Sequence, residues 1–163
     1  MISMNYADVV SALGDTAANQ INATGSFSGC STDTRTLEKD NLYIALKGER
    51  FDGHDFVKQA QDKGAACLLL EKSVHTDIPT IQVKDSRKAM GALANVWRKQ
   101  LNTPIVAVTG SNGKTTVKEM LKQIFSKAGS VHATQGNLNN DIGVPLTLFK
   151  LSASDDYAGT RTG

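Results

Sequence analysis

One lysine and two threonines that follow a glycine-containing turn are the residues of this chain best suited to chemistry. The stretch 105–116 reads Ile-Val-Ala-Val-Thr-Gly-Ser-Asn-Gly-Lys-Thr-Thr. Between a strand and a helix, the N–H groups of such a turn bind phosphate oxygens, its lysine reaches the outer phosphates, and a hydroxyl ligates Mg²⁺. We therefore predict a nucleotide site in which Lys114 and Thr115 are catalytic and Thr115 is the metal ligand. The predicted cofactor-binding residues are Gly110, Ser111, Asn112, Gly113, Lys114, Thr115 and Thr116.

The segments on either side of this turn have the patterns that a phosphate-binding loop requires. Residues 105–108 are apolar and mostly β-branched, which predicts a buried parallel strand. Residues 117–128 carry apolar side chains at helical spacing, which predicts a helix. The loop has the shorter Gly-x-x-Gly-Lys-Thr form, because Val108 stands where the commonest pattern has its first glycine. A solvated turn with an exposed lysine is the alternative interpretation.

The rest of the chain alternates between short apolar runs and helical patterns, which is typical of an α/β protein. Runs that predict strands lie at 19–24, 29–33, 42–46, 65–70, 80–83, 105–108 and 131–134. Patterns that predict helices lie at 5–13, 54–63, 86–101, 117–128 and 145–151.

These elements predict a small N-terminal α/β domain followed by the beginning of a Rossmann-like ATPase domain. We expect the first domain over 1–83, a connecting helix and linker over 84–104, and the partial ATPase domain over 105–157. Residues 158–163 lack periodicity and are expected to be a frayed or foreign tail. A P-loop domain needs further strands, a carboxylate for Mg²⁺ and groups for the acceptor substrate, so we expect a front part of a longer enzyme.

Composition excludes several classes of partner. The 18 basic and 16 acidic residues give a net charge of +2, and no basic stripe with interleaved aromatics is present, which argues against nucleic acid. No apolar run approaches the ~20 residues of a membrane span. Cys30 and Cys67 form no C-x-x-C pair, so we expect reduced core residues in a cytoplasmic protein.

A second polar cluster lies at the end of the predicted strand at 29–33. Hydroxyls, a carboxylate and a guanidinium at this place can bind a uracil edge, ribose hydroxyls and a diphosphate. A turn built by its own Asp and Ser/Thr side chains is the alternative interpretation. The candidate substrate-binding residues of this cluster are Ser31, Asp33, Thr34 and Arg35.

A third candidate segment follows the predicted strand at 42–46. Open α/β sheets bind ligands outside the carboxyl ends of their strands, and glycines let the main chain approach a ligand. The alternative is a solvated charged loop whose phenylalanine packs into the core, with the histidine at a helix start rather than acting as an acid or base. The candidate residues are Lys47, Gly48, Phe51, Asp52, Gly53 and His54.

Three asparagines follow the predicted strand at 131–134. Their amides offer donors and acceptors that suit a neutral sugar–peptide substrate, whereas an asparagine-rich turn is the alternative. The candidates are Asn137, Asn139 and Asn140. Lys118 and Lys122, one turn apart after the glycine loop, are expected on a solvated helix face.

Four stretches together resemble the Mur ligases, the ATP-dependent amide-bond enzymes of peptidoglycan synthesis. They are 31–35, 46–56, 109–116 and 136–146. The second and fourth stretches make the resemblance strongest to the member that adds D-alanyl-D-alanine to UDP-N-acetylmuramoyl-tripeptide. This resemblance favours UDP-sugar contact for the 31–35 and 47–54 residues, and muramoyl contact for the asparagines.

The resemblance also implies the domain plan and the reaction. Such enzymes have a UDP-sugar-binding domain, an ATPase domain that uses ATP and Mg²⁺, and a third domain that binds D-alanyl-D-alanine; the enzyme is expected to be a monomer. The γ-phosphoryl group of ATP is transferred to the tripeptide carboxylate, and the amine attacks the acyl phosphate. After Ala158 the family continues into a strand with a Mg²⁺-binding Glu, whereas this chain has Gly-Thr-Arg-Thr-Gly. We therefore expect this chain alone to be catalytically incomplete.

Two other functions remain open at this point. One is a non-enzymatic module that binds a UDP-sugar or nucleotide; a module that binds a UDP-sugar alone would not need Lys114 and Thr115. A generic P-loop kinase is disfavoured because small kinases commonly begin at the strand that precedes the loop.

Overall fold

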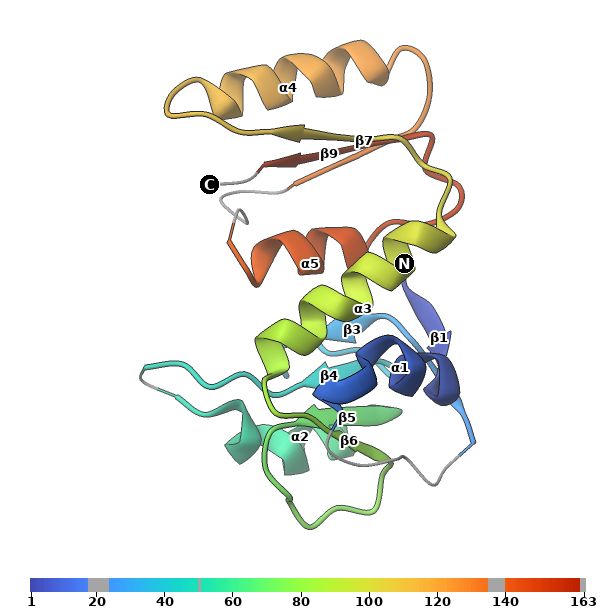
Figure 1. Cartoon of the computed structure of the whole chain (residues 1–163), viewed down its shortest axis with the longest axis vertical. Helices are drawn as coiled ribbons and strands as arrows, with labels where there is room; N and C mark the ends of the chain where they lie inside the picture. Colours follow the sequence, from blue (N-terminus) through green and yellow to red (C-terminus); the bar gives the residue numbers. More distant parts are fainter. Residues whose placement is uncertain (18–23, 50, 135–139, 162–163) are drawn as a thin grey trace. The chain divides into compact units, whose positions relative to one another are not determined.

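A computed structural model describes residues 1–17, 24–49, 51–134 and 140–161 of the chain. The chain separates into two compact units, Met1–Leu93 and Ala94–Gly163. The division falls inside helix α3 (Ser86–Gln100), within the segment that the sequence marks as a connection (Figure 1).

The first unit is built on a four-stranded parallel sheet with the strand order β3-β4-β5-β6. Each of these strands was predicted from the sequence, and each is shorter than its prediction. The strands are β3 (Cys30–Ser31), β4 (Leu42–Ile44), β5 (Cys67–Leu70) and β6 (Thr80–Gln82).

Both faces of this sheet are apolar, as expected for parallel strands covered on two sides. Helix α2 (Val57–Asp62), which continues a 3₁₀ turn η2 (Gly53–Phe56), packs Val57 and Ala60 against one face. Tyr43 and Leu68 pair in register on that face. By the alternation of a strand, Ile44 and Leu69 point to the opposite face, where both are fully buried.

A short helix and an antiparallel pair complete this unit. Helix α1 begins at Tyr6, because Asn5 Oδ1 accepts a hydrogen bond from the Asp8 N–H at 2.8 Å and caps it. The predicted strand at 19–24 lies almost wholly outside the described residues. The elements are β1 (Ser3–Asn5), α1 (Tyr6–Leu13), the 3₁₀ turn η1 (Gly14–Thr16) and β2 (Ser26–Ser28), with β1 antiparallel to β2.

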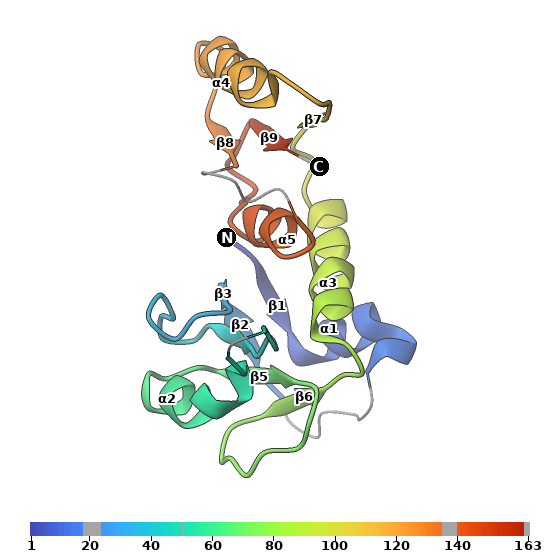
Figure 2. The ribbon, with the colours of Figure 1, turned by 90° about the vertical axis from the view of Figure 1, so that its left-hand side faces the viewer.

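The second unit contains a three-stranded parallel sheet with the order β7-β9-β8. Figure 2 shows β8, β9 and β7 side by side, with α4 over one face and α5 against the other. The ring of Phe125 on α4 stacks on that of Tyr157 at 4.9 Å. The elements are β7 (Ile105–Val108), α4 (Lys114–Phe125), β8 (Val131–Ala133), α5 (Gly143–Phe149) and β9 (Tyr157–Arg161).

The structure differs from the sequence-based expectations at two places in this unit. Residues 158–161, expected to fray, form the greater part of β9 between two other strands. Hydrogen bonding from both neighbours makes a strand of a segment that has no alternating pattern. The 105–108 strand was predicted to be buried, yet Ala107 is exposed, because β7 lies at an edge of the sheet.

None of the helices in the described ranges combines the length and the apolar character of a transmembrane segment.

Candidate functional site

The glycine loop lies between the carboxyl end of β7 and the first turn of α4. Gly110 has φ 140° and Gly113 has φ 76°, and both angles lie in the region that side-chain-bearing residues rarely adopt. Gly113 is the residue that precedes the helix, so Lys114 is its first residue. The helix therefore begins three residues earlier than predicted, and its positive dipole end lies at the loop.

The predicted cofactor residues lie together in this loop. Gly110, Gly113, Thr115 and their neighbours are exposed, while Lys114 is half-buried and its ammonium donates a hydrogen bond to the Gly110 carbonyl. That bond closes the loop into a ring around the start of the helix. The arrangement has the N–H groups, the cation and the hydroxyl that a nucleotide phosphate requires.

The residues of the loop also fit a magnesium nucleotide. Within the described ranges no group of three His, Cys, Asp or Glu side chains could hold a metal by itself. Mg²⁺ commonly takes few protein ligands and completes its shell with phosphate oxygens and water. The hydroxyl of Thr115 is the group that would hold the ion beside a triphosphate.

A second candidate site lies at the carboxyl edge of the sheet in the first unit, where a turn follows β3. Ser31 Oγ donates to the Asp33 carbonyl at 2.8 Å and shares a 2.9 Å hydrogen bond with Thr36 Oγ1. Arg35 donates two hydrogen bonds to the Asp33 carboxylate, from Nε to Oδ1 at 3.0 Å and from Nη2 to Oδ2 at 2.6 Å. Ser31 and Asp33 thus build the turn that presents the exposed Arg35 guanidinium.

Thr34 is fixed by two side chains of the helical segment that packs under the sheet. Its hydroxyl donates to Gln59 Oε1 at 2.5 Å, and its carbonyl accepts from Lys63 Nζ at 2.6 Å. Neither partner was identified from the sequence. The turn at 31–35 is therefore anchored to α2 and to the residue after it.

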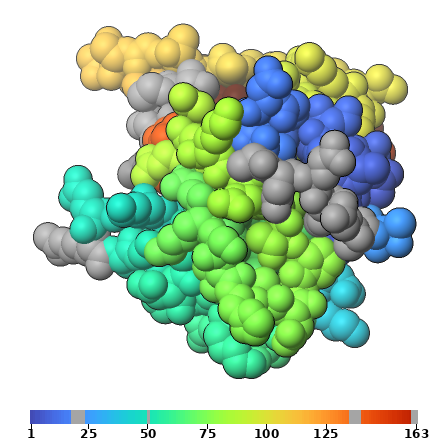
Figure 3. All heavy atoms as spheres, turned by 60° about the horizontal axis from the view of Figure 1, so that its bottom comes forward, coloured from blue at the N-terminus to red at the C-terminus, as the bar shows by residue number. Residues whose placement is uncertain are grey.

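The loop after β4 projects from the unit as a narrow hairpin (Figures 1 and 3). Its base is closed by the bridge between Lys47 and Asp52, and the Gly48 N–H donates to the Phe51 carbonyl at 2.9 Å. Phe51 is 58% exposed, so the interpretation that it packs in the core is wrong. A large exposed ring on an anchored loop is available to a ligand.

Gly53 and His54 lie beneath this loop. The Gly53 N–H donates to the Leu46 carbonyl, and its own carbonyl accepts from Tyr43 Oη, both at 2.9 Å. A Cβ atom at Gly53 would lie 2.7 Å from the Leu46 nitrogen and 3.1 Å from the Ala45 Cα. Glycine is therefore needed here for close packing of main chain on main chain.

A buried histidine joins the loop to the next strand. The His54 side chain is 3% exposed, and its Nε2 accepts from the Glu71 N–H at 2.9 Å. Nδ1 then carries the proton and donates to Asp52 Oδ1 at 2.5 Å, while Asp52 Oδ2 pairs with Lys72 at 2.8 Å. Asp52 and His54 thus hold the loop in shape, which agrees with the interpretation of His54 as a structural residue.

These contacts predict that the first unit loses stability in acid. The Lys72 and His54 donors hold the pKa of Asp52 well below its usual range, and the Arg35 guanidinium lowers the pKa of Asp33 to about 2. A carboxyl whose pKa is lowered in the folded state stabilises the fold at any pH above its unfolded-state pKa, which is about 4. This stability is lost as the pH falls toward the folded-state pKa. We expect the thermal midpoint to fall between pH 5 and pH 2.

The Asp52→Asn variant tests this cause. It should unfold at lower temperature than the wild type at pH 6, with a smaller further decrease at pH 3, in scanning calorimetry. Asp62→Asn is the matched control, because the exposed ion pair of Asp62 with Lys58 contributes little. Equal pH dependence in Asp52→Asn and the wild type would exclude Asp52 as the source.

Of the three candidate asparagines, Asn137 and Asn139 lie outside the described residues. Asn140 Oδ1 accepts hydrogen bonds from the Gly143 N–H at 2.8 Å and the Ile142 N–H at 3.3 Å. The side-chain amide oxygen of Asn140 therefore accepts N–H groups at the first turn of α5. Contact of these asparagines with substrate stays a prediction.

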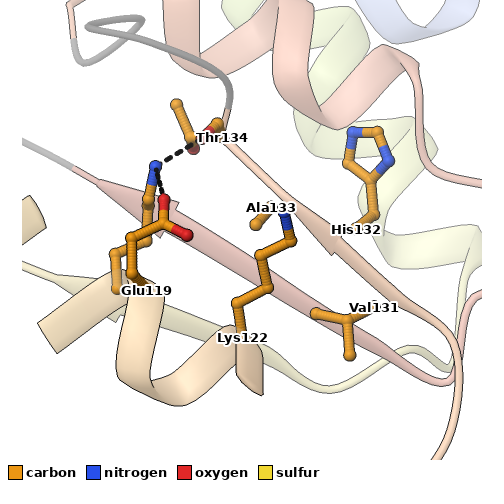
Figure 4. A pocket seen from close by; sticks show the side chains of 7 residues that line it. Glu119, Lys122, Val131, His132, Ala133 and Thr134 are labelled. Carbon is orange, nitrogen blue, oxygen red and sulfur yellow. Dashed lines mark hydrogen bonds and ion pairs between the residues drawn. The ribbon is translucent and has the colours of Figure 1, made fainter. Parts of the chain in front are cut away.

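A cleft of about 280 Å³ lies between α4 and β8, and the sequence did not indicate it (Figure 4). Lys118, expected on a solvated face, is 6% exposed. Its ammonium donates to the Thr134 carbonyl at 2.8 Å and pairs with Glu119 at 3.0 Å. The lining residues are Lys118, Glu119, Lys122, Val131, His132, Ala133 and Thr134.

Comparison with known families decides the identity of this fold and loop. The model of the "Mur ligase family, catalytic domain" matches residues 26–125, and that of the "Mur ligase middle domain" matches residues 108–158. The chain belongs to the Mur ligase family. The first match covers the turn at 31–35, the projecting loop and the glycine loop.

The relatives of this Mur ligase chain include a curated ligase and two solved structures. The UDP-N-acetylmuramoyl-tripeptide–D-alanyl-D-alanine ligase of Escherichia coli (strain K12) is 52% identical over 132 residues, which cover 81% of this chain and 29% of that protein. A crystal structure of MurF from Acinetobacter baumannii has a TM-score of 0.90 and 35% identity, covering 100% of this chain and 36% of that one. MurF ligase from Thermotoga maritima in complex with ADP has a TM-score of 0.75 and 29% identity, covering 82% of this chain and 31% of that one.

The chain thus spans about a third of the length of the relatives that it matches.

Proposed function

We propose that this chain is the N-terminal part of a cytoplasmic, ATP-dependent and ADP-forming ligase that joins D-alanyl-D-alanine to UDP-N-acetylmuramoyl-tripeptide. The observation that carries the proposal is the glycine loop, in which Gly110 and Gly113 place Lys114 at the start of α4. The name of the Escherichia coli relative and the ADP bound in the Thermotoga maritima structure support it. A first domain at 1–83 and a second domain that begins at 105 and includes β9 are part of this proposal, as is the monomeric state.

In the nucleotide site, each residue has a separate role in this proposal. The loop N–H groups and the α4 dipole bind phosphate oxygens. Lys114 leaves the Gly110 carbonyl and neutralises charge on the outer phosphates. Bound through Thr115, Mg²⁺ would supply further charge neutralisation at the phosphates.

In the UDP-muramoyl site, the proposed contacts are the groups that the structure leaves exposed. The Arg35 guanidinium and the Lys47 ammonium suit a diphosphate, and the ring of Phe51 suits a base or sugar face. Ser31, Asp52 and His54 act beneath them, because their polar atoms already bind within the chain. The asparagines are proposed to contact the muramoyl peptide.

Titration calorimetry with UDP-N-acetylmuramoyl-tripeptide tests this proposal. The wild-type chain should bind, and Phe51→Ala should weaken binding about tenfold, since stacking of an aromatic ring on a base contributes about 1–3 kcal/mol. The thermal midpoint should not change, because Phe51 is largely exposed. Phe56→Ala, a second exposed phenylalanine outside the loop, is the matched control.

Absence of any binding by the wild type would contradict the proposal. Equal losses of affinity in Phe51→Ala and Phe56→Ala would show that the projecting loop does not contact this ligand.

A further inference from the structure

The face of α4 that packs on the sheet carries a lysine, Lys118, at a position where an amphipathic helix normally has an apolar residue. Lys118, Leu121 and Phe125 lie along the face of α4 that covers the sheet. Met120 and Ile124, on another face, are 60% and 61% exposed. Burying a lysine is unfavourable unless its charge is paired and hydrogen-bonded, so packing alone does not explain Lys118.

The buried ammonium has two oxygen partners. Lys118 Nζ donates to the Thr134 carbonyl at 2.8 Å and forms an ion pair with Glu119 Oε1 at 3.0 Å. The neighbouring lysine lowers the pKa of Glu119, which keeps its carboxylate charged beside the ammonium. Figure 4 shows the His132 ring directed away from Glu119, so this histidine takes no part in the pair.

Thr134 is held from the opposite side as well. Its N–H donates to the Gly159 carbonyl at 2.9 Å, and its hydroxyl donates to the same oxygen at 3.3 Å. Its carbonyl is thereby turned toward α4 and the ammonium of Lys118. Thr134 directly follows β8, at the carboxyl end of the strand, and it precedes the candidate asparagines in the chain.

Lys118 therefore connects helix α4, whose first turn is proposed to bind phosphate, with the residue that follows β8. It lies one helical turn after Lys114, and its contact fixes the residue from which the asparagine segment departs. We propose that Lys118 is a positioning residue of the ligase, which sets the place of Thr134 relative to the phosphate-binding end of α4. This inference rests on the proposed function, which assigns contact with the muramoyl peptide to the candidate asparagines.

The test compares Lys118→Met with Lys122→Met, which lies one turn further along α4 and lines the same cleft. Hydrogen exchange measured by mass spectrometry should be at least about tenfold faster at the Thr134 amide in Lys118→Met. Exchange in Lys122→Met should equal that of the wild type. Lys118→Arg, which keeps a charged donor, should restore slow exchange at least in part.

Ligand binding provides the second measurement, on the same three variants. ADP with Mg²⁺ should bind Lys118→Met within about twofold of the wild type, while UDP-N-acetylmuramoyl-tripeptide should bind at least about tenfold more weakly. UDP alone, which lacks the muramoyl peptide, should bind all variants equally.

Three outcomes would overturn the inference. They are unchanged exchange at Thr134 in Lys118→Met, equal losses for ADP and the tripeptide, and the same effects in Lys122→Met. Failure of the wild type to bind the tripeptide would instead contradict the proposed function, and the exchange experiment would still decide the role of Lys118.

Discussion

Replacing Lys114 with alanine will remove most of the affinity of this chain for ADP with Mg²⁺. The ammonium belongs to the first residue of α4 and donates to the Gly110 carbonyl, at the turn whose N–H groups would bind phosphate oxygens. A hydrogen bond to a charged group contributes about 1.5–3 kcal/mol, so we expect the dissociation constant to rise about tenfold to a hundredfold. Titration calorimetry with ADP and Mg²⁺ measures the change directly.

The control for this experiment is Lys127→Ala, an exposed lysine just beyond the other end of α4. It removes the same net charge from the unit and should leave the dissociation constant unchanged. The same affinity in Lys114→Ala and the wild type would show that the loop does not bind phosphate through this lysine, and the nucleotide site would have to be assigned elsewhere.

Substitution of two glycines in the first unit is expected to change stability in opposite directions. Gly53→Ala places a methyl group within 3 Å of the main chain of Leu46, which cannot move without breaking the hydrogen bond from the Gly53 N–H. We expect a loss of about 1–3 kcal/mol, typical of overpacking. Gly91→Ala lies in α3, where the added methyl meets nothing within 4 Å, and should gain about 0.5–1 kcal/mol.

Denaturant titration followed by hydrogen exchange at the amides of β4 and β5 measures both changes within the first unit. Gly53→Ala should also weaken binding of UDP-N-acetylmuramoyl-tripeptide, because Gly53 supports the loop that carries Phe51. If Gly53→Ala were as stable as the wild type, the close contact with Leu46 would not be a constraint on this loop.

Much of the fold followed from the sequence because local patterns determine it. The apolar runs at 42–46 and 65–70 are surrounded on all sides in the sheet, so composition alone identifies them as strands. The glycine loop was predictable since two positive φ angles demand glycine at two fixed places before a lysine. The order of the strands needed the structure.

The remaining features depend on neighbours that are distant in the chain. The apolar residues of α4 form two stripes, and spacing alone could not tell that Leu121 and Phe125 face the sheet while Met120 and Ile124 do not. Lys118 was misassigned to a solvated face for the same reason. Lys72 was missed as a partner of Asp52, although its place just after β5, at the ligand-binding edge, was a usable signal.

The order of strands in the second unit has a consequence for how this protein acquires its shape during synthesis. β9 lies between β7 and β8 but follows both in the chain, and Ile105 pairs with Ala158. Until β9 has left the ribosome, β7 and β8 both lack the strand that lies between them. The glycine loop, which follows β7, then has no completed sheet beneath it. Such long-range pairing is slow, and the first unit should therefore become resistant to protease before the second does.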